Sequence, residues 1–324
     1  MSRGIWRRAL CLAPLAFLRP YGVAADPQAV IQPRSRAWPA QPPFAPLLHI
    51  QSQLVLVPVT VTDRLGRPVI GLEKASFRLF DGNREQRILS VAFEDVPMAI
   101  AIVFDASASM EQKMRKARAG VRELVRIANP EDEFLLIEFD DNVRLAQPWT
   151  SDGSRLLAPL SQTAPRGRTA LLDAIAMALD QLRKSGQPRR AVVILSDGGD
   201  NRSRHTEKAI RSLVQESGAL LYAAGMFSGT SPDLSAEEID GPRLLKDLAE
   251  ATGGRLFPVG NLNDLPETAR QIGLELHNQY VLAFAPDQLE ADGKYHRVRV
   301  KVVAPEGQSM LRAHWRTGYR APVR

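Results

Sequence analysis

The sequence contains a single cysteine, Cys11. One cysteine excludes an intramolecular disulfide framework and any zinc or iron–sulfur site built from several cysteines. No apolar stretch approaches the roughly 18 residues that predict a membrane-spanning helix. The patterns Gly-x-Ser-x-Gly, His-Glu-x-x-His and Gly-x-x-x-x-Gly-Lys are also missing. The sequence therefore lacks the common signatures of serine hydrolases, zinc proteases and nucleotide-binding loops.

The first 25 residues account for most of the net charge. The chain has 42 Lys and Arg against 36 Asp and Glu, a formal charge of +6 that hints at an acidic partner such as nucleic acid. However, Arg3, Arg7 and Arg8 precede the short apolar run 9–18, and Val23-Ala24-Ala25 follows it. This layout predicts a secretory signal peptide over 1–25, the alternative being a short amphipathic or disordered tail. Its removal would take away four Arg and the only Cys, and would leave a formal charge of +2. We therefore expect an exported protein, periplasmic or extracellular.

Patterning divides the remaining 299 of 324 residues into four segments. Six prolines predict an extended linker over 26–48. Short β-branched or alternating runs predict a β unit with a first part over 49–95 and a second over 286–324. These parts form either one discontinuous sandwich, with the intervening segment inserted into it, or separate β pieces. The strands are expected at 54–62, 77–80, 88–93, 296–303 and 311–319.

Residues 96–285 alternate between apolar runs and helical periodicity. This pattern predicts right-handed βαβ units and a doubly wound, Rossmann-like parallel sheet, so the fold class is α/β with a flanking β unit. Strands are expected at 98–104, 134–139, 191–195, 219–224, 256–259 and 280–284. Helices are expected at 114–128, 170–182, 206–216, 242–251 and 265–278. Such sheets bind ligands beyond the carboxyl ends of their strands.

Oxygen-bearing side chains gather in the segments that lead from strands into helices. The five residues are Asp105, Ser107, Ser109, Thr169 and Asp197. Carboxylates and hydroxyls without His or Cys suit a hard divalent cation, Mg²⁺ first, with Mn²⁺ or Ca²⁺ as alternatives. Taken singly, the hydroxyls could be helix N-caps and Asp197-Gly198 a turn. A site short of protein carboxylates leaves its metal under-neutralised and would attract an external carboxylate.

Asp105-x-Ser107-x-Ser109, Thr169 and Asp197-Gly198 resemble the metal-ion-dependent adhesion site of von Willebrand factor type A (VWA) domains. The resemblance covers about 96–285. The flanking segments 59–69, 77–82 and 318–319 are similar to secreted bacterial VWFA-related proteins. The resemblance implies that Ser107 and Ser109 ligate the metal directly, and Thr169 in a ligand-competent state. Asp105 and Asp197 would act directly or through water.

Several acids near the motif have roles that the sequence leaves open, namely Asp140, Asp141, Asp173 and Asp200. Asp173 is the one we consider for a supporting role behind the metal ligands, against the alternatives of a helix cap or a solvent-facing acid. Asp200 is expected in the loop that follows Asp197.

We expect an exported, metal-dependent protein-binding module, not an enzyme, whose metal takes an Asp or Glu of a partner protein. A metal-dependent hydrolase and a structural module without metal-dependent binding are the alternatives. The hydrolase needs a general base, yet His49, His205, His277, His296 and His314 are scattered and only His205 follows a candidate loop. Nucleic acid is not expected, because the charge without the signal is small and aromatics make up 6%. The basic stretch 297–301 is interpreted as the solvated face of an edge strand. The oligomeric state is left open.

Overall fold

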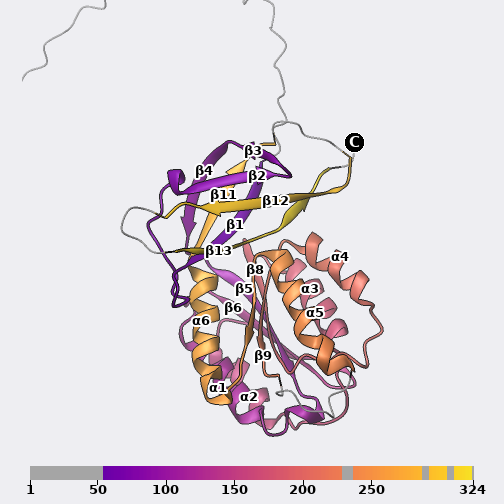
Figure 1. Ribbon diagram of the computed structural model, residues 1–324. Helices are drawn as coiled ribbons and strands as arrows, with labels where there is room; N and C mark the ends of the chain where they lie inside the picture. The colour runs from indigo at the N-terminus through magenta and orange to yellow at the C-terminus, as the bar shows by residue number, and fades with distance from the viewer. Residues whose placement is uncertain (1–53, 228–235, 287–291, 305–309, 323–324) are drawn as a thin grey trace, which may run out of the picture. The chain divides into compact units, whose positions relative to one another are not determined.

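The computed structural model describes residues 54–227, 236–286, 292–304 and 310–322 (Figure 1). The predicted signal peptide and the predicted linker lie outside these residues. Within the described part, no helix combines the length and the apolar character needed to cross a bilayer.

A six-stranded sheet forms the centre of the α/β part, in the order β10-β9-β8-β5-β6-β7. All neighbours are parallel except β6 and β7. The strands are β5 (Met98–Asp105), β6 (Glu133–Phe139), β7 (Val143–Thr150), β8 (Arg189–Ser196), β9 (Leu220–Gly225) and β10 (Leu256–Pro258). The predicted doubly wound α/β class is confirmed.

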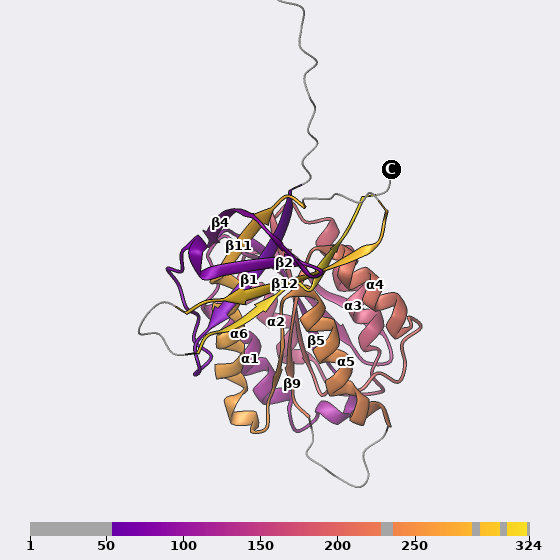
Figure 2. The ribbon, with the colours of Figure 1, turned by 45° about the horizontal axis from the view of Figure 1, so that its top comes forward.

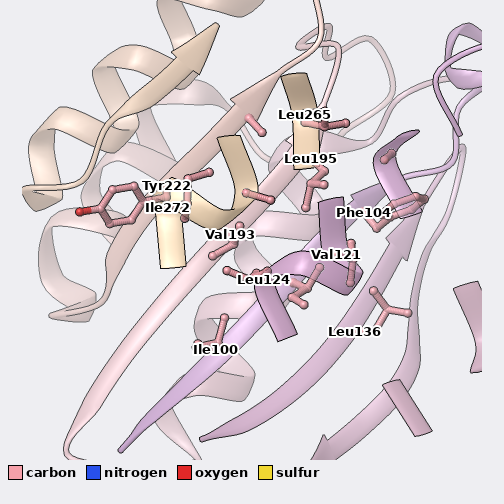
Figure 3. Close-up of a cluster of buried hydrophobic side chains, with 14 of the residues drawn as sticks. Ile100, Phe104, Val121, Leu124, Leu136, Val193, Leu195, Tyr222, Leu265 and Ile272 are labelled. Atoms are coloured by element: carbon pink, nitrogen blue, oxygen red, sulfur yellow. The ribbon is translucent and has the colours of Figure 1, made fainter. Parts of the chain in front are cut away.

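Helices cover both faces of this sheet (Figure 1). They are α1 (Met114–Arg126), α2 (Gly153–Gln162), α3 (Leu171–Arg183), α4 (Glu207–Ser217), α5 (Ala236–Thr252) and α6 (Leu265–His277). All eight residues of β5 are buried, because its side chains alternate between two hydrophobic cores, one on each face of the sheet. Ile100 and Phe104 pack with α1, α2 and α6 (Figure 3), whereas Ala101 and Val103 pack with α3, α4 and α5.

Two four-stranded antiparallel sheets pack around a separate hydrophobic core (Figure 2). Their orders are β13-β1-β11-β4 and β14-β12-β2-β3. The strands are β1 (Val55–Thr62), β2 (Phe77–Asp81), β3 (Arg84–Gln86), β4 (Ile88–Glu94), β11 (Gln279–Phe284), β12 (Tyr295–Val302), β13 (Arg312–Trp315) and β14 (Gly318–Arg320). Strands from the two ends of the chain pair directly, β1 with β13 and β2 with β12. These pairings agree with the first of the two arrangements that the sequence allows, a β unit shared by both ends.

The strand expected at 280–284 does not close the α/β series. As β11 it pairs antiparallel with β1 and β4, and its Tyr280, Leu282 and Phe284 pack in the core between the two antiparallel sheets. An apolar run directly after a helix reads the same in either setting, because both settings bury it.

The interpretation of 297–301 as part of an edge strand holds only in part. Strand β12 lies between β14 and β2, but its pairing with β14 covers only Tyr295–Arg297, and its pairing with β2 covers Val298–Val302. Arg299 and Lys301 also lie over the ring of Phe80, 5.0 and 5.5 Å from its centroid. Cation–π contact is therefore a further role of this part of the basic stretch.

Polar contacts join the β unit to the α/β part around Tyr222, which is fully buried. Its hydroxyl lies 3.4 Å from that of Thr60, and Gln279 donates to the same Thr60 hydroxyl at 3.2 Å. Nearby, Glu275 is fully buried and pairs with Arg255, whose Nε lies 3.1 Å from the carboxylate. Burial raises the pKa of Glu275 to about 7 even though Arg255 opposes the shift.

Candidate metal centre

The five predicted residues come from three segments at the carboxyl edge of the central sheet. Asp105 is the last residue of β5, and Asp197 directly follows the last residue of β8. These two strands are parallel neighbours, so their carboxyl ends lie side by side. Thr169 stands two residues before α3, in the third segment.

Backbone hydrogen bonds fasten the three segments to one another. Ala108 N–H donates to the carbonyl of Gly167 at 3.1 Å, which joins the serine segment to the Thr169 segment. Thr169 N–H donates to Asn201 Oδ1 at 3.0 Å, and Asn201 N–H donates back to the Thr169 carbonyl at 3.1 Å. Gly167 has φ +68°, a conformation that glycine adopts without a Cβ penalty. These contacts hold the three segments together at one edge of the sheet.

The two carboxylates are buried and differ in their partners. Asp105 is fully buried; its Oδ1 accepts from Ser107 N–H at 2.9 Å and its Oδ2 from the Ser196 hydroxyl at 2.5 Å. Asp197 accepts from Lys113 Nζ at 2.8 Å. Within the described ranges no Lys, Arg or His nitrogen comes within 4 Å of the Asp105 carboxylate. Burial, and then the charge of Asp197, raise the pKa of Asp105 to about 7.

The hydroxyl groups do not act as helix caps. Ser107 is the N-cap residue of the 3₁₀ turn Ala108–Met110, but its side chain makes no capping hydrogen bond. The N-cap of α3 is Ala170, not Thr169. Instead, Ser107 Oγ lies 3.0 Å from Ser109 Oγ, with Ser107 buried and Ser109 exposed. The capping interpretation is thus not supported for these two residues. Asp197-Gly198 does form a turn, with Gly198 at φ +94°.

The neighbouring acids are held by other partners. Asp140 pairs with Arg144 and Arg166, and these cations with a backbone N–H keep its pKa low against the opposing effect of burial. Asp173 lies 2.6 Å from His205 Nδ1 and accepts the backbone N–H groups of Arg204 and His205. Asp173 therefore ties the loop after Asp197 to α3.

Two further acids complete this surrounding set. Asp200 accepts from Leu172 N–H and the Ser203 hydroxyl, and burial raises its pKa. Asp141 lies 3.9 Å from Arg202. Both therefore have protein partners of their own.

Three contributors were not identified from the sequence, namely Lys113, Ser196 and Asn201. Lys113 lies eight positions after Asp105, in a stretch where lysine is common on a solvated helix. Ser196 reads as the end of a buried strand, and Asn201 as a loop residue. Their roles depend on contacts between segments distant in sequence, which no local pattern signals.

Comparison with known protein families finds a match within the α/β part. Residues 100–199 match the family model described as von Willebrand factor type A domain. The match supports a VWA domain in the α/β part. It spans β5 to the turn after β8, and so includes all five predicted residues. No curated protein sequence matches.

The solved structures that match this chain are only distantly similar to it. A von Willebrand factor type A protein from Catenulispora acidiphila is 13% identical, with 76% of this chain and 75% of that chain covered and a TM-score of 0.48. An aerotolerance-related membrane protein from Bacteroides fragilis is 21% identical over 54% of this chain and 98% of that chain, with a TM-score of 0.44. The PilB minor pilin from Streptococcus sanguinis is 16% identical, with 56% of this chain and 63% of that chain covered and a TM-score of 0.44. At these identities the likeness concerns the fold.

The donor set of the five predicted residues fits a hard cation. All five side chains offer oxygen, and the described residues contain no cluster of three or more His, Cys, Asp or Glu. The set therefore suits Mg²⁺, Mn²⁺ or Ca²⁺ better than zinc or copper. Asp105 supplies an observation of its own, because a fully buried carboxylate without a cationic neighbour is costly unless a charge compensates it.

His205 lines a cavity beside α3. This cavity has a volume of about 950 Å³, lies between α3 and α4, and is lined by Asp173, Met177 and His205 among others. None of the five predicted residues lines it. Among the described residues no hydrogen bond or ion pair joins His205 to the five predicted residues, so the geometry gives no specific support to a metal-dependent hydrolase.

Proposed function

We propose that this chain is an exported protein-binding module whose VWA domain holds a divalent cation through Asp105, Ser107, Ser109, Thr169 and Asp197. Mg²⁺ is the first candidate, and Mn²⁺ or Ca²⁺ are the alternatives. The bound cation would supply an open coordination position for a carboxylate of a partner protein. The module is a binder and not an enzyme, and nucleic acid is not its partner.

One observation carries the proposal. Asp105 and Asp197 reach the same sheet edge as three hydroxyl-bearing residues, and Asp105 is buried without a cation of its own. A buried carboxylate in this state destabilises the metal-free protein, and a ligand that gains from its charge would offset that cost. A divalent cation beside it is the simplest compensation.

The carboxylate preference of the partner follows from charge. Two protein carboxylates balance a divalent cation only in the absence of Lys113, and the hydroxyls of Ser107, Ser109 and Thr169 add no charge. With Lys113 present, the loaded site carries a formal +1. An Asp or Glu side chain from a partner would neutralise it and fill the open position.

Export is the part of the proposal that depends on sequence alone. It rests on the basic, apolar and small-residue pattern of residues 1–25. Fractionation of cells that express the full chain with a C-terminal tag tests it. Retention in the cytoplasm at full length would contradict it.

Metal-dependent capture tests the binding function. The purified full chain is used to capture proteins in Mg²⁺ and in EDTA, with Asp105→Ala as the site variant. Asp180→Ala is the matched control, because Asp180 is an exposed acid of α3 that pairs with Arg183 and Lys184. We expect partners that bind in Mg²⁺, leave in EDTA, are lost with Asp105→Ala and persist with Asp180→Ala. Identical capture by Asp105→Ala would contradict the proposal.

A further inference from the structure

Lys113 is the one basic residue at the proposed metal site among the residues the structure describes. It directly precedes α1, and its Nζ lies 2.8 Å from Asp197 Oδ2. The side chains of Lys113 and Asp197 are only 13% and 7% exposed. This burial separates the pair from the surface ion pairs of the chain, which water screens.

The pair leaves the charges at the site unequally balanced. Asp197 has the ammonium group, whereas the nearest partners of Asp105 are the Ser107 N–H and the Ser196 hydroxyl. Lys113 therefore neutralises one of two buried carboxylates. A tethered cation of this kind occupies the carboxylate that an incoming cation would also use.

We propose that Lys113 is a built-in counter-cation of the site, which holds Asp197 in the metal-free protein and lowers the affinity for the divalent cation. This inference rests on the proposed metal site. Lys113 acts through Asp197 and is a positioning residue, not a ligand.

Lys113 also shapes what the loaded site attracts. A divalent cation with Asp105, Asp197 and Lys113 has a formal sum of +1, and the same site without Lys113 has a sum of zero. The lysine thus weakens metal binding while keeping the loaded site positive. A site that remains positive favours an anionic group as its final ligand.

Calorimetric titration of the full chain with Mg²⁺ and with Mn²⁺ measures the effect. The test variants are Lys113→Met, which removes the charge, Lys113→Gln, which removes it but stays polar, and Lys113→Arg, which retains it. Arg115→Met is the matched control, because Arg115 is an exposed base on the first turn of α1. We expect Lys113→Met and Lys113→Gln to bind the cation on the order of tenfold more tightly, because a repelling charge at short range is removed. Lys113→Arg and Arg115→Met should stay within about twofold of the parent.

Thermal unfolding in EDTA supplies a readout that needs no metal. Removing Lys113 leaves Asp197 buried and unpaired, so Lys113→Met should melt at a lower temperature than Arg115→Met and recover more on addition of Mg²⁺. An unchanged or weaker metal affinity in both neutral variants overturns the inference alone, since Lys113 would then be irrelevant or would support metal binding. No metal binding by the parent or by either neutral variant overturns both the metal site and this inference. Binding only after Lys113 is neutralised supports the inference and contradicts metal loading of the parent chain.

Discussion

Replacing Asp105 with asparagine should stabilise the metal-free protein at neutral and alkaline pH. The carboxyl group has its ordinary pKa of 3.8 in the unfolded chain, and burial with the charge of Asp197 raises it to about 7 in the folded protein. A raised pKa means that the folded state resists ionisation, so stability is full below about pH 4 and is lost as the pH rises through 7. A difference of about three pKa units corresponds to about 4 kcal/mol. The uncharged amide of the Asp105→Asn variant would remove this cost.

The substitution also has a smaller, opposing effect. Asp105 Oδ2 accepts the Ser196 hydroxyl, and an amide nitrogen in its place cannot accept, so the variant loses about 1 kcal/mol. The net gain is therefore about 3 kcal/mol at pH 8 and close to zero at pH 4. Glu275, whose pKa is also about 7, lowers the stability of parent and variant equally between pH 4 and pH 8, so it does not affect their difference.

Urea unfolding in EDTA at pH 4, 6 and 8 measures this difference. The stabilisation of Asp105→Asn should grow with pH, while Mg²⁺ should stabilise the parent and not the variant. A variant that is less stable than the parent at pH 8 in EDTA would refute the reasoning, because the buried charge would then be compensated within the protein.

Further predictions concern other parts of the molecule. Arg255→Met removes the ion-pair partner of the fully buried Glu275 and should lower the free energy of unfolding by about 3 kcal/mol in urea at pH 8. Adding Glu275→Gln should recover this loss. A double variant whose loss equals the sum of the two single losses would contradict this. Burial and nearby positive charge hold the pKa of His314 at about 4, so the free energy of unfolding should fall as the pH drops from 6.5 through 4. His314→Gln should flatten that part of the profile of stability against pH. An unchanged profile in the variant would contradict this. Leu136→Ala leaves a cavity at a fully buried position and should lower the free energy of unfolding by about 2–5 kcal/mol. A loss below about 1 kcal/mol would contradict this.

Much of the α/β part could be predicted from the sequence because its signals are local. The fully apolar run of β5 and the periodic face of α1 each determine an element without reference to distant residues. The spacing Asp105-x-Ser107-x-Ser109 likewise places three oxygen groups in one loop after a strand. Strand β7 and helix α2 were not predicted from the sequence: β7 is only half-buried and contains Pro148, and α2 contains Pro159.

Contacts between distant segments could not be predicted. The apolar run of β11 is compatible with either sheet, and only its pairing with β1 and β4 assigns it to the β unit. The charges at 297–301 are typical of an edge strand, and the pairing of β14 with Tyr295–Arg297 depends on a segment about twenty residues further along the chain. Lys113 and Asp197 are 84 positions apart, so their ion pair exists only once β8 lies beside β5.

A crystal structure of the full chain grown with Mn²⁺, with anomalous scattering recorded at the manganese edge, tests the proposed metal centre most directly. We predict one anomalous peak at the carboxyl edge of the central sheet, within about 2.0–2.3 Å of the hydroxyl oxygens of Ser107 and Ser109. Asp105 and Asp197 should contact the ion directly or through water. An ordered Mn²⁺-grown crystal with no peak there would contradict the metal centre.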